Sequence, residues 1–193
     1  MKKIAKIMTG VLLAGAGAST AAYAADGQPT QAAQAIGAHH VGLNVGYDSQ
    51  AAGQGVSGGV VPTIVADYGN FHGGLGFSMH NEHYSAADMD VQRYFVTAFV
   101  GTDIAKFGNG SLTAGVKGDG TFMGGDAEDA NMDRTGYDLA GYVGMDYSIS
   151  DHWEMNGKLY AVNWGRTAGQ PENSDEHHLQ VLGGGNIGMT YKF

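Results

Sequence analysis

The last fifteen residues of the chain alternate between apolar or glycine positions and positions that are mostly polar or small. The first set is Leu179, Val181, Gly183, Gly185, Ile187, Met189, Tyr191 and Phe193. Because successive side chains of a strand point to opposite faces, this pattern predicts one long strand with an apolar face. A helix would scatter the same residues around its whole circumference.

The same alternation recurs upstream and predicts eight strands in all. Their expected ranges are 36–48, 60–68, 71–82, 91–102, 111–122, 136–149, 152–164 and 178–193. Short connections at 69–70, 103–110 and 150–151 alternate with longer polar ones at 49–59, 83–90, 123–135 and 165–177. This layout is typical of outer-membrane barrels, so we predict an all-β fold, an eight-stranded antiparallel transmembrane β-barrel. Strand 91–102 is apolar on both faces after Arg93, and the pattern does not orient it.

The first 24 residues have the three-part layout of a secretory signal peptide. A basic head ends at Lys6, an apolar stretch runs from Ile7 to Ala18, and Ala22-Tyr23-Ala24 precedes the expected cleavage point. The apolar stretch is shorter than the roughly 20 residues that a membrane-spanning helix needs. We therefore expect a signal peptide (1–24), a short periplasmic lead-in (25–35) and a barrel domain (36–193).

Composition narrows the possible partners. The net charge is −9, and the expected signal peptide carries three lysines and no acid, so the remaining chain is more acidic still. Such a chain lacks the basic footprint of a nucleic-acid-binding protein. The absence of cysteine excludes disulfides and thiolate metal sites. We expect no cofactor.

The apolar face of the strands carries bulky residues, whereas the other face carries glycines and charges. An eight-stranded barrel has an interior just wide enough for side chains, so the bulky set fits better outside, against lipid. The alternative is a soluble exported β-barrel with the apolar face inside, binding a small apolar ligand. With the apolar face outside, we expect a polar network that fills the lumen and leaves no general pore. Its predicted members are Asp67, Lys117, Asp119, Asp138, Asp146, Glu154, Lys158 and Lys192.

The chain resembles small outer-membrane barrels of the OmpA/OmpX type, in which the last strand ends in an aromatic residue. That resemblance implies an assembly signal for the barrel-assembly machinery at Gly185, Ile187, Met189, Tyr191 and Phe193. The stretch from "AGVKGDGTF" to "GMDYSISDHWEMNGKLY" is also similar to the YfaZ family of small outer-membrane proteins. The resemblance implies a monomer in the outer membrane of a Gram-negative cell, in contact with lipid and lipopolysaccharide, with a structural or surface-interaction role.

One short motif suggests an enzyme instead. His83-Tyr84-Ser85 resembles the His-x-Ser-Asn motif of lipid A deacylases, which are barrels of this size, but Ala86 stands where that family has Asn. A histidine beside a serine activates the hydroxyl only with a third group to orient the imidazole. We therefore favour a chance pairing in a loop, and keep a lipid-modifying outer-membrane enzyme as the alternative.

Metal binding is a further candidate function. His80, His83, His177 and His178 lie near the strand ends next to long connections, but no tight metal-binding spacing is present. The acidic run 126–133 lacks the mid-loop glycine and final glutamate of an EF-hand loop. We expect solvated histidines, a solvated acidic loop and no metal site.

Overall fold

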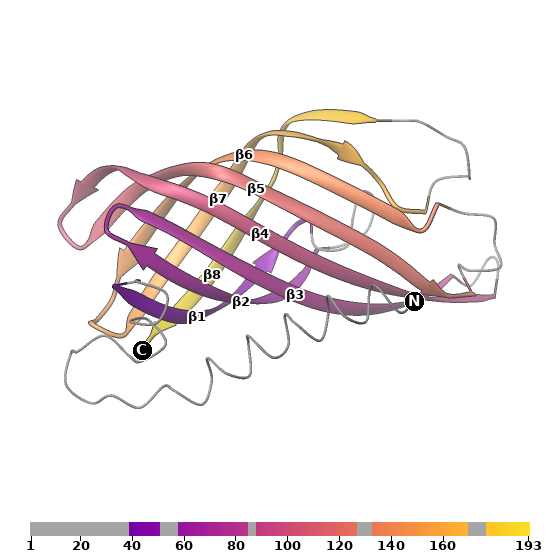
Figure 1. The fold of residues 1–193 in the computed structure, drawn as a ribbon, viewed down its shortest axis with the longest axis horizontal. Coiled ribbons are helices and arrows are strands. Elements are labelled where there is room, and N and C mark those ends of the chain that lie inside the picture. Colours follow the sequence, from indigo (N-terminus) through magenta and orange to yellow (C-terminus); the bar gives the residue numbers. More distant parts are fainter. Residues whose placement is uncertain (1–38, 51–57, 85–87, 127–132, 170–176) are drawn as a thin grey trace.

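The computed structural model describes residues 39–50, 58–84, 88–126, 133–169 and 177–193. These residues form eight strands: β1 (His40–Asp48), β2 (Gly59–Tyr68), β3 (Phe71–Tyr84), β4 (Met89–Phe107), β5 (Gly110–Gly125), β6 (Thr135–Ser148), β7 (Trp153–Arg166) and β8 (His178–Lys192). Figure 1 shows them side by side, with the short turns gathered at its left-hand end. None of the described residues forms a helix long and apolar enough to cross a membrane.

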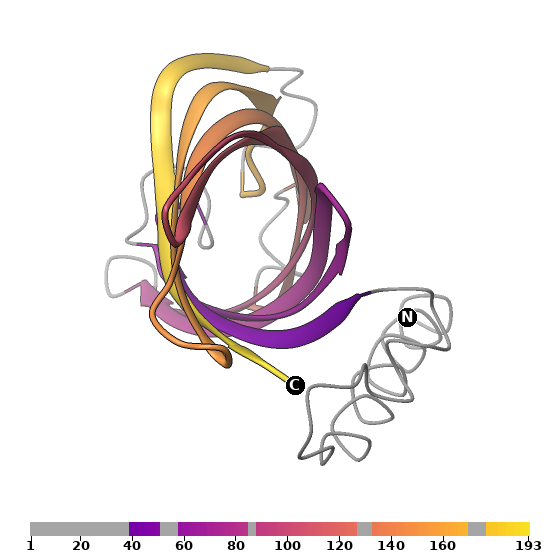
Figure 2. The same cartoon turned by 90° about the vertical axis from the view of Figure 1, so that its left-hand side faces the viewer.

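Every strand pairs antiparallel with its neighbours in sequence, and β1 closes the ring by pairing with β8. The closing register runs from Gly42 opposite Lys192 to Asp48 opposite Asn186. Figure 2 looks into this ring from the short-turn end. The predicted all-β, eight-stranded antiparallel barrel is therefore confirmed.

Two strands are longer than predicted. β4 continues through Asp103 and Lys106 to Phe107, because these charged residues lie at the barrel end, where the Lys106 ammonium pairs with the Asp103 carboxylate at 3.1 Å. The connection predicted at 103–110 is consequently a turn of two residues, in which Gly108 has a φ of 52°. β3 also continues to Tyr84, so His83 belongs to a strand, opposite Asp90, and not to the predicted loop.

The apolar faces of the strands point outward. Each strand exposes a large apolar side chain in the middle of the wall or near it, with exposed fractions of 41% to 62%: Leu43, Val60, Leu75, Val100, Val116, Val143, Leu159 and Ile187. The structure also orients β4, which the pattern left open. Its residues Val91, Arg93, Phe95 and Thr97 are buried inside the barrel, whereas Val100 faces out.

An irregularity in β7 changes which residues face outward. The pairing of β7 with β8 shifts register between Tyr160 and Val162. Tyr160 is 1% exposed and Trp164 is 41% exposed, although side chains four residues apart share a face in a regular strand. The predicted outward position of Ala161 is therefore wrong, and Val162 and Trp164 take the outward positions beyond the bulge.

Candidate functional site: the barrel lumen

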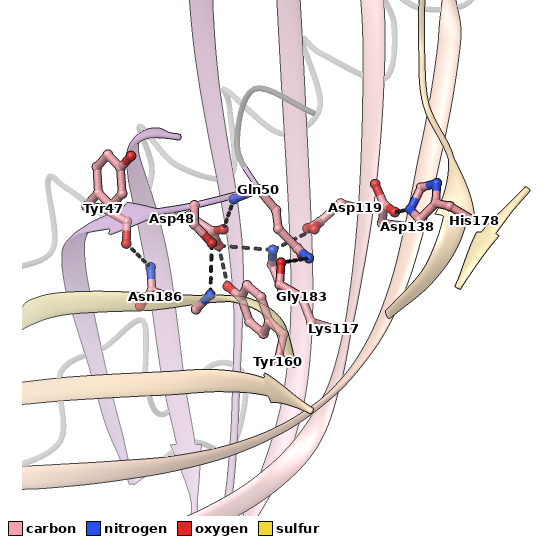
Figure 3. Close-up of polar contacts among 12 residues, drawn as sticks. Tyr47, Asp48, Gln50, Lys117, Asp119, Asp138, Tyr160, His178, Gly183 and Asn186 are labelled. Atoms are coloured by element: carbon pink, nitrogen blue, oxygen red, sulfur yellow. Dashed lines mark hydrogen bonds and ion pairs between the residues drawn. The ribbon is translucent and has the colours of Figure 1, made fainter. Parts of the chain in front are cut away.

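A cluster of crossing side chains closes the middle of the lumen. We call Asp48, Phe95, Lys117, Asp119 and Tyr160 the septum. The Lys117 ammonium lies 3.0 Å from the Asp48 carboxylate and 2.5 Å from that of Asp119. The Tyr160 hydroxyl donates to the same Asp48 carboxylate at 2.5 Å (Figure 3). Since Asp48 is on β1 and Lys117 on β5, this ion pair joins opposite walls of the ring.

The septum charges are almost completely removed from water. The side chains of Lys117, Asp48 and Asp119 are only 3–4% exposed. Burial of a charge is costly unless partners replace the lost water. Here one cation meets two carboxylates, and its ammonium also lies 4.4 Å from the centre of the Tyr160 ring. The septum therefore satisfies most of its charges internally and leaves no need for a water-filled bore.

A second layer crosses the lumen on the short-turn side of the septum. The Lys158 ammonium on β7 lies 4.0 Å from the centre of the Phe99 ring on β4. The Tyr142 hydroxyl and the Nε2 atom of His72 are 3.2 Å apart. Glycines opposite these groups leave room for them: a Cβ at Gly115 would lie 2.5 Å from the Tyr142 hydroxyl oxygen.

A cavity of about 460 Å³ lies beyond this layer, at the short-turn end of the barrel. We call it the vestibule. Its wall includes Lys192, whose ammonium lies 2.6 Å from the Glu154 carboxylate and 4.0 Å from that of Asp67. Asp146 and Lys158 also line it. The vestibule is therefore a polar cavity with charges of both signs.

The structure places the eight residues predicted for the lumen network in different environments. Lys117 and Asp119 belong to the septum, whereas Asp67, Asp146, Glu154, Lys158 and Lys192 line the vestibule. Asp138 lies apart from both groups and accepts from the Nε2 atom of His178 at 2.7 Å (Figure 3).

Sequence reasoning missed two members of the septum. Asp48 lies at the end of β1 on its mixed face, but it adjoins a long connection, where a carboxylate is expected to be solvated. Tyr160 falls next to the β7 bulge, so the alternation does not assign it to the lumen. The signal that could have identified Asp48 is its inward parity with Asn44, which is also buried.

The candidate catalytic pair is only partly described. His83 lies in β3, and Ser85 lies outside the described residues, so the structure assembles no nucleophile with a base.

No group of three or more potential metal ligands occurs in the part of the chain that the structure describes. His80 is 3.3 Å from the Ser78 hydroxyl, and His177 stacks on Trp164. The acidic run lies mostly outside the described residues. Of its two described ends, Asp133 pairs with Arg166, and Asp126 accepts from the Asp90 backbone N–H at 2.8 Å.

Two clusters of aromatic rings mark the outer surface at different heights. Near the short-turn end, Trp153, Tyr191 and Phe193 form edge-to-face pairs with ring centres 5.0 and 5.4 Å apart. Toward the long connections, Trp164 contacts Tyr137 with ring centres 5.6 Å apart. Aromatic girdles of this kind lie at both membrane–water interfaces in outer-membrane barrels.

Comparisons with known proteins give structural likeness only. No family model matches the sequence, and no curated protein matches it. The chain is similar to outer membrane protein W of E. coli, with 14% identity and a TM-score of 0.45 over 79% of this chain and 98% of that one. It is also similar to Neisserial surface protein A (12%, 0.46, 80% and 95%) and to Ail, the attachment invasion locus protein of Yersinia pestis (13%, 0.37, 80% and 95%). At these values the likeness carries no argument about function, and the fold rests on the strand pairing itself.

Proposed function

We propose that this protein is a small β-barrel of the bacterial outer membrane with a structural or surface-interaction role, and that it is not a general porin. The single observation that carries this proposal is the Lys117–Asp48 ion pair, which joins opposite walls across the lumen. A steady aqueous pore needs a continuous bore, and the septum occupies it.

The outer surface supports the location in a membrane. Trp153 and Trp164 both face outward on β7, eleven residues apart. At a rise of about 3.3 Å per residue and a tilt of about 35–45°, they are separated by roughly 26–30 Å along the barrel axis. That separation matches the apolar band of about 25 Å expected of outer-membrane barrels. A soluble barrel binding an apolar ligand would need its apolar side chains inside.

Planar-bilayer recording of the purified, folded protein tests the filled lumen. We expect no stable, ohmic steps from the natural protein. The double variant Lys117→Gly, Tyr160→Gly shortens two crossing side chains and is expected to produce steps. Large, steady steps from the natural protein would contradict the proposal. Membrane fractionation, with gel mobility before and after boiling, tests the location separately: a soluble protein with one mobility would contradict it.

The last strand supports a proposed assembly signal. Ile187, Met189 and Tyr191 face outward, and the backbone N–H of Phe193 donates to the Val41 carbonyl at 2.9 Å, next to the closing seam. We expect deletion of Phe193 to lower the amount of folded barrel in the membrane while export continues. Equal membrane levels of the deleted and natural chains in a competition assay would contradict that role. Contact with lipid and lipopolysaccharide, and a monomeric state, are part of the same proposal.

A further inference from the structure

Most charges in the vestibule have a close partner of opposite sign. Lys192 pairs with Glu154, and Lys106 pairs with Asp103. Two charged residues that line the same cavity differ: Asp146 and Lys158. Within the described residues, neither makes a hydrogen bond or an ion pair through its charged group. The vestibule therefore holds one unpaired anion and one unpaired cation.

The unpaired anion has a second acceptor beside it. Asp146 on β6 lies directly opposite Asn156 on β7 in the antiparallel register. Asn156 also lines the cavity and is 5% exposed. Its Nδ2 atom donates to the Thr190 hydroxyl at 3.0 Å, but its Oδ1 atom has no partner among the described residues. Neighbouring carboxylate and amide oxygens that both lack donors suit a ligand group with several N–H bonds, such as an ammonium.

The unpaired cation lies one step further along the same face. Lys158 is opposite Gly144, so it is the diagonal neighbour of Asp146, at a Cα separation of roughly 7–8 Å. Its ammonium contacts the faces of the Phe99 and Tyr142 rings at 4.0 and 5.7 Å. Ring faces attract a cation but replace only part of its lost hydration. The ammonium therefore still lacks a hydrogen-bond acceptor.

We infer that the vestibule is a binding site for a small zwitterion of amino-acid size. The ammonium group of the ligand binds Asp146 with the help of Asn156, and its carboxylate binds Lys158. A simple cation would face the charge of Lys158, and a simple anion would face that of Asp146. Only a molecule with both charges satisfies both residues. The cavity, at about 460 Å³, is within the usual size range of small-molecule sites.

Titration of the natural protein tests this inference without any substitution. The folded, full-length barrel in detergent micelles is titrated with glycine, methylamine, acetate or O-phosphoethanolamine, and backbone amide shifts are followed by NMR. We expect glycine to cause saturable shifts centred on residues 144–146 and 156–158. Methylamine and acetate should bind about tenfold more weakly or not at all, since each loses one charge-assisted interaction.

Three results of these titrations would overturn the inference. The first is the absence of saturable shifts with glycine. The second is equal binding of methylamine or acetate, which would indicate a site for a single charge. The third is tighter binding of O-phosphoethanolamine than of glycine, which would indicate a lipid headgroup in place of a free amino acid.

Matched variants identify the residues that bind. Asp146→Asn keeps the shape of the side chain but removes its charge, and we expect glycine affinity to fall about tenfold or more. Asp103→Asn is the control, because Asp103 lies in the same cavity but already pairs with Lys106. Its affinity should stay within about twofold of the natural protein. Equal losses in the two variants would contradict the inference, since they would reflect only the overall charge of the cavity. A mobility shift on heating verifies that each variant is folded, and the titrations of the natural protein decide the question if one is not.

Discussion

The two halves of the lumen use charge differently. In the septum, the side chains of Lys117 and Asp48 are both 4% exposed and come from opposite walls of the ring. In the vestibule, the side chains of Lys192 and Glu154 are 20% and 17% exposed and come from the neighbouring strands β8 and β7. Only the first kind of pair links parts of the barrel that the strand ladder does not already join. The comparison indicates that the septum fixes the cross-section of the barrel, whereas the vestibule keeps its charges accessible to solutes.

The largest effect is expected from removal of the shared cation of the septum. Lys117→Met leaves the Asp48 and Asp119 carboxylates buried without an opposite charge. Breaking a buried ion pair in this way costs about 3–5 kcal/mol. Urea unfolding in lipid vesicles, followed by the fluorescence of Trp153 and Trp164, measures the change. A loss below about 1 kcal/mol, as for an exposed pair, would remove the proposed difference between the two halves.

The second effect concerns the wall outside the septum. Val143 is 47% exposed on β6, about midway between the outward-facing Tyr137 and Tyr147. A lysine there would face the middle of the bilayer, so Val143→Lys should cost about 2–4 kcal/mol. Val181→Lys is the matched control, because Val181 lies opposite Val162, close to the outer aromatic cluster. Its cost should be about 0–1 kcal/mol, and equal costs at the two positions would contradict the proposed membrane depth.

The third effect separates the two layers of crossing side chains. Tyr160→Phe removes a hydrogen bond to a carboxylate, so it should cost about 1.5–3 kcal/mol. Tyr142→Phe removes a hydrogen bond to His72 in the layer next to the vestibule and should cost about 0.5–1.5 kcal/mol when the imidazole is neutral. The same unfolding assay compares them. A larger loss for Tyr142→Phe would place the stabilising contacts on the vestibule side.

The barrel was predictable from sequence because its wall has a local signature. Each strand alternates within itself, and the register of Leu43 or Ile187 needs no knowledge of distant residues. The septum was not predictable in the same way. Asp48 and Lys117 are 69 residues apart in sequence, and their contact depends on how far the strands are staggered around the ring. The β7 bulge also hides Tyr160, because one extra residue reverses the alternation after it.

The smallest effect is expected from the best-paired lysine of the vestibule. Lys192→Met removes the ion pair with Glu154, but both groups are partly exposed, so the loss should be at most about 1 kcal/mol. Salt provides the contrast with the septum. The Debye length falls from about 10 Å at 0.1 M salt to about 3 Å at 1 M, and buried pairs are screened much less than accessible ones. The deficit of Lys192→Met relative to the natural protein should therefore disappear at high salt, while that of Lys117→Met persists. If both deficits respond to salt alike, the septum is as accessible to ions as the vestibule, and the distinction between the two halves of the lumen fails.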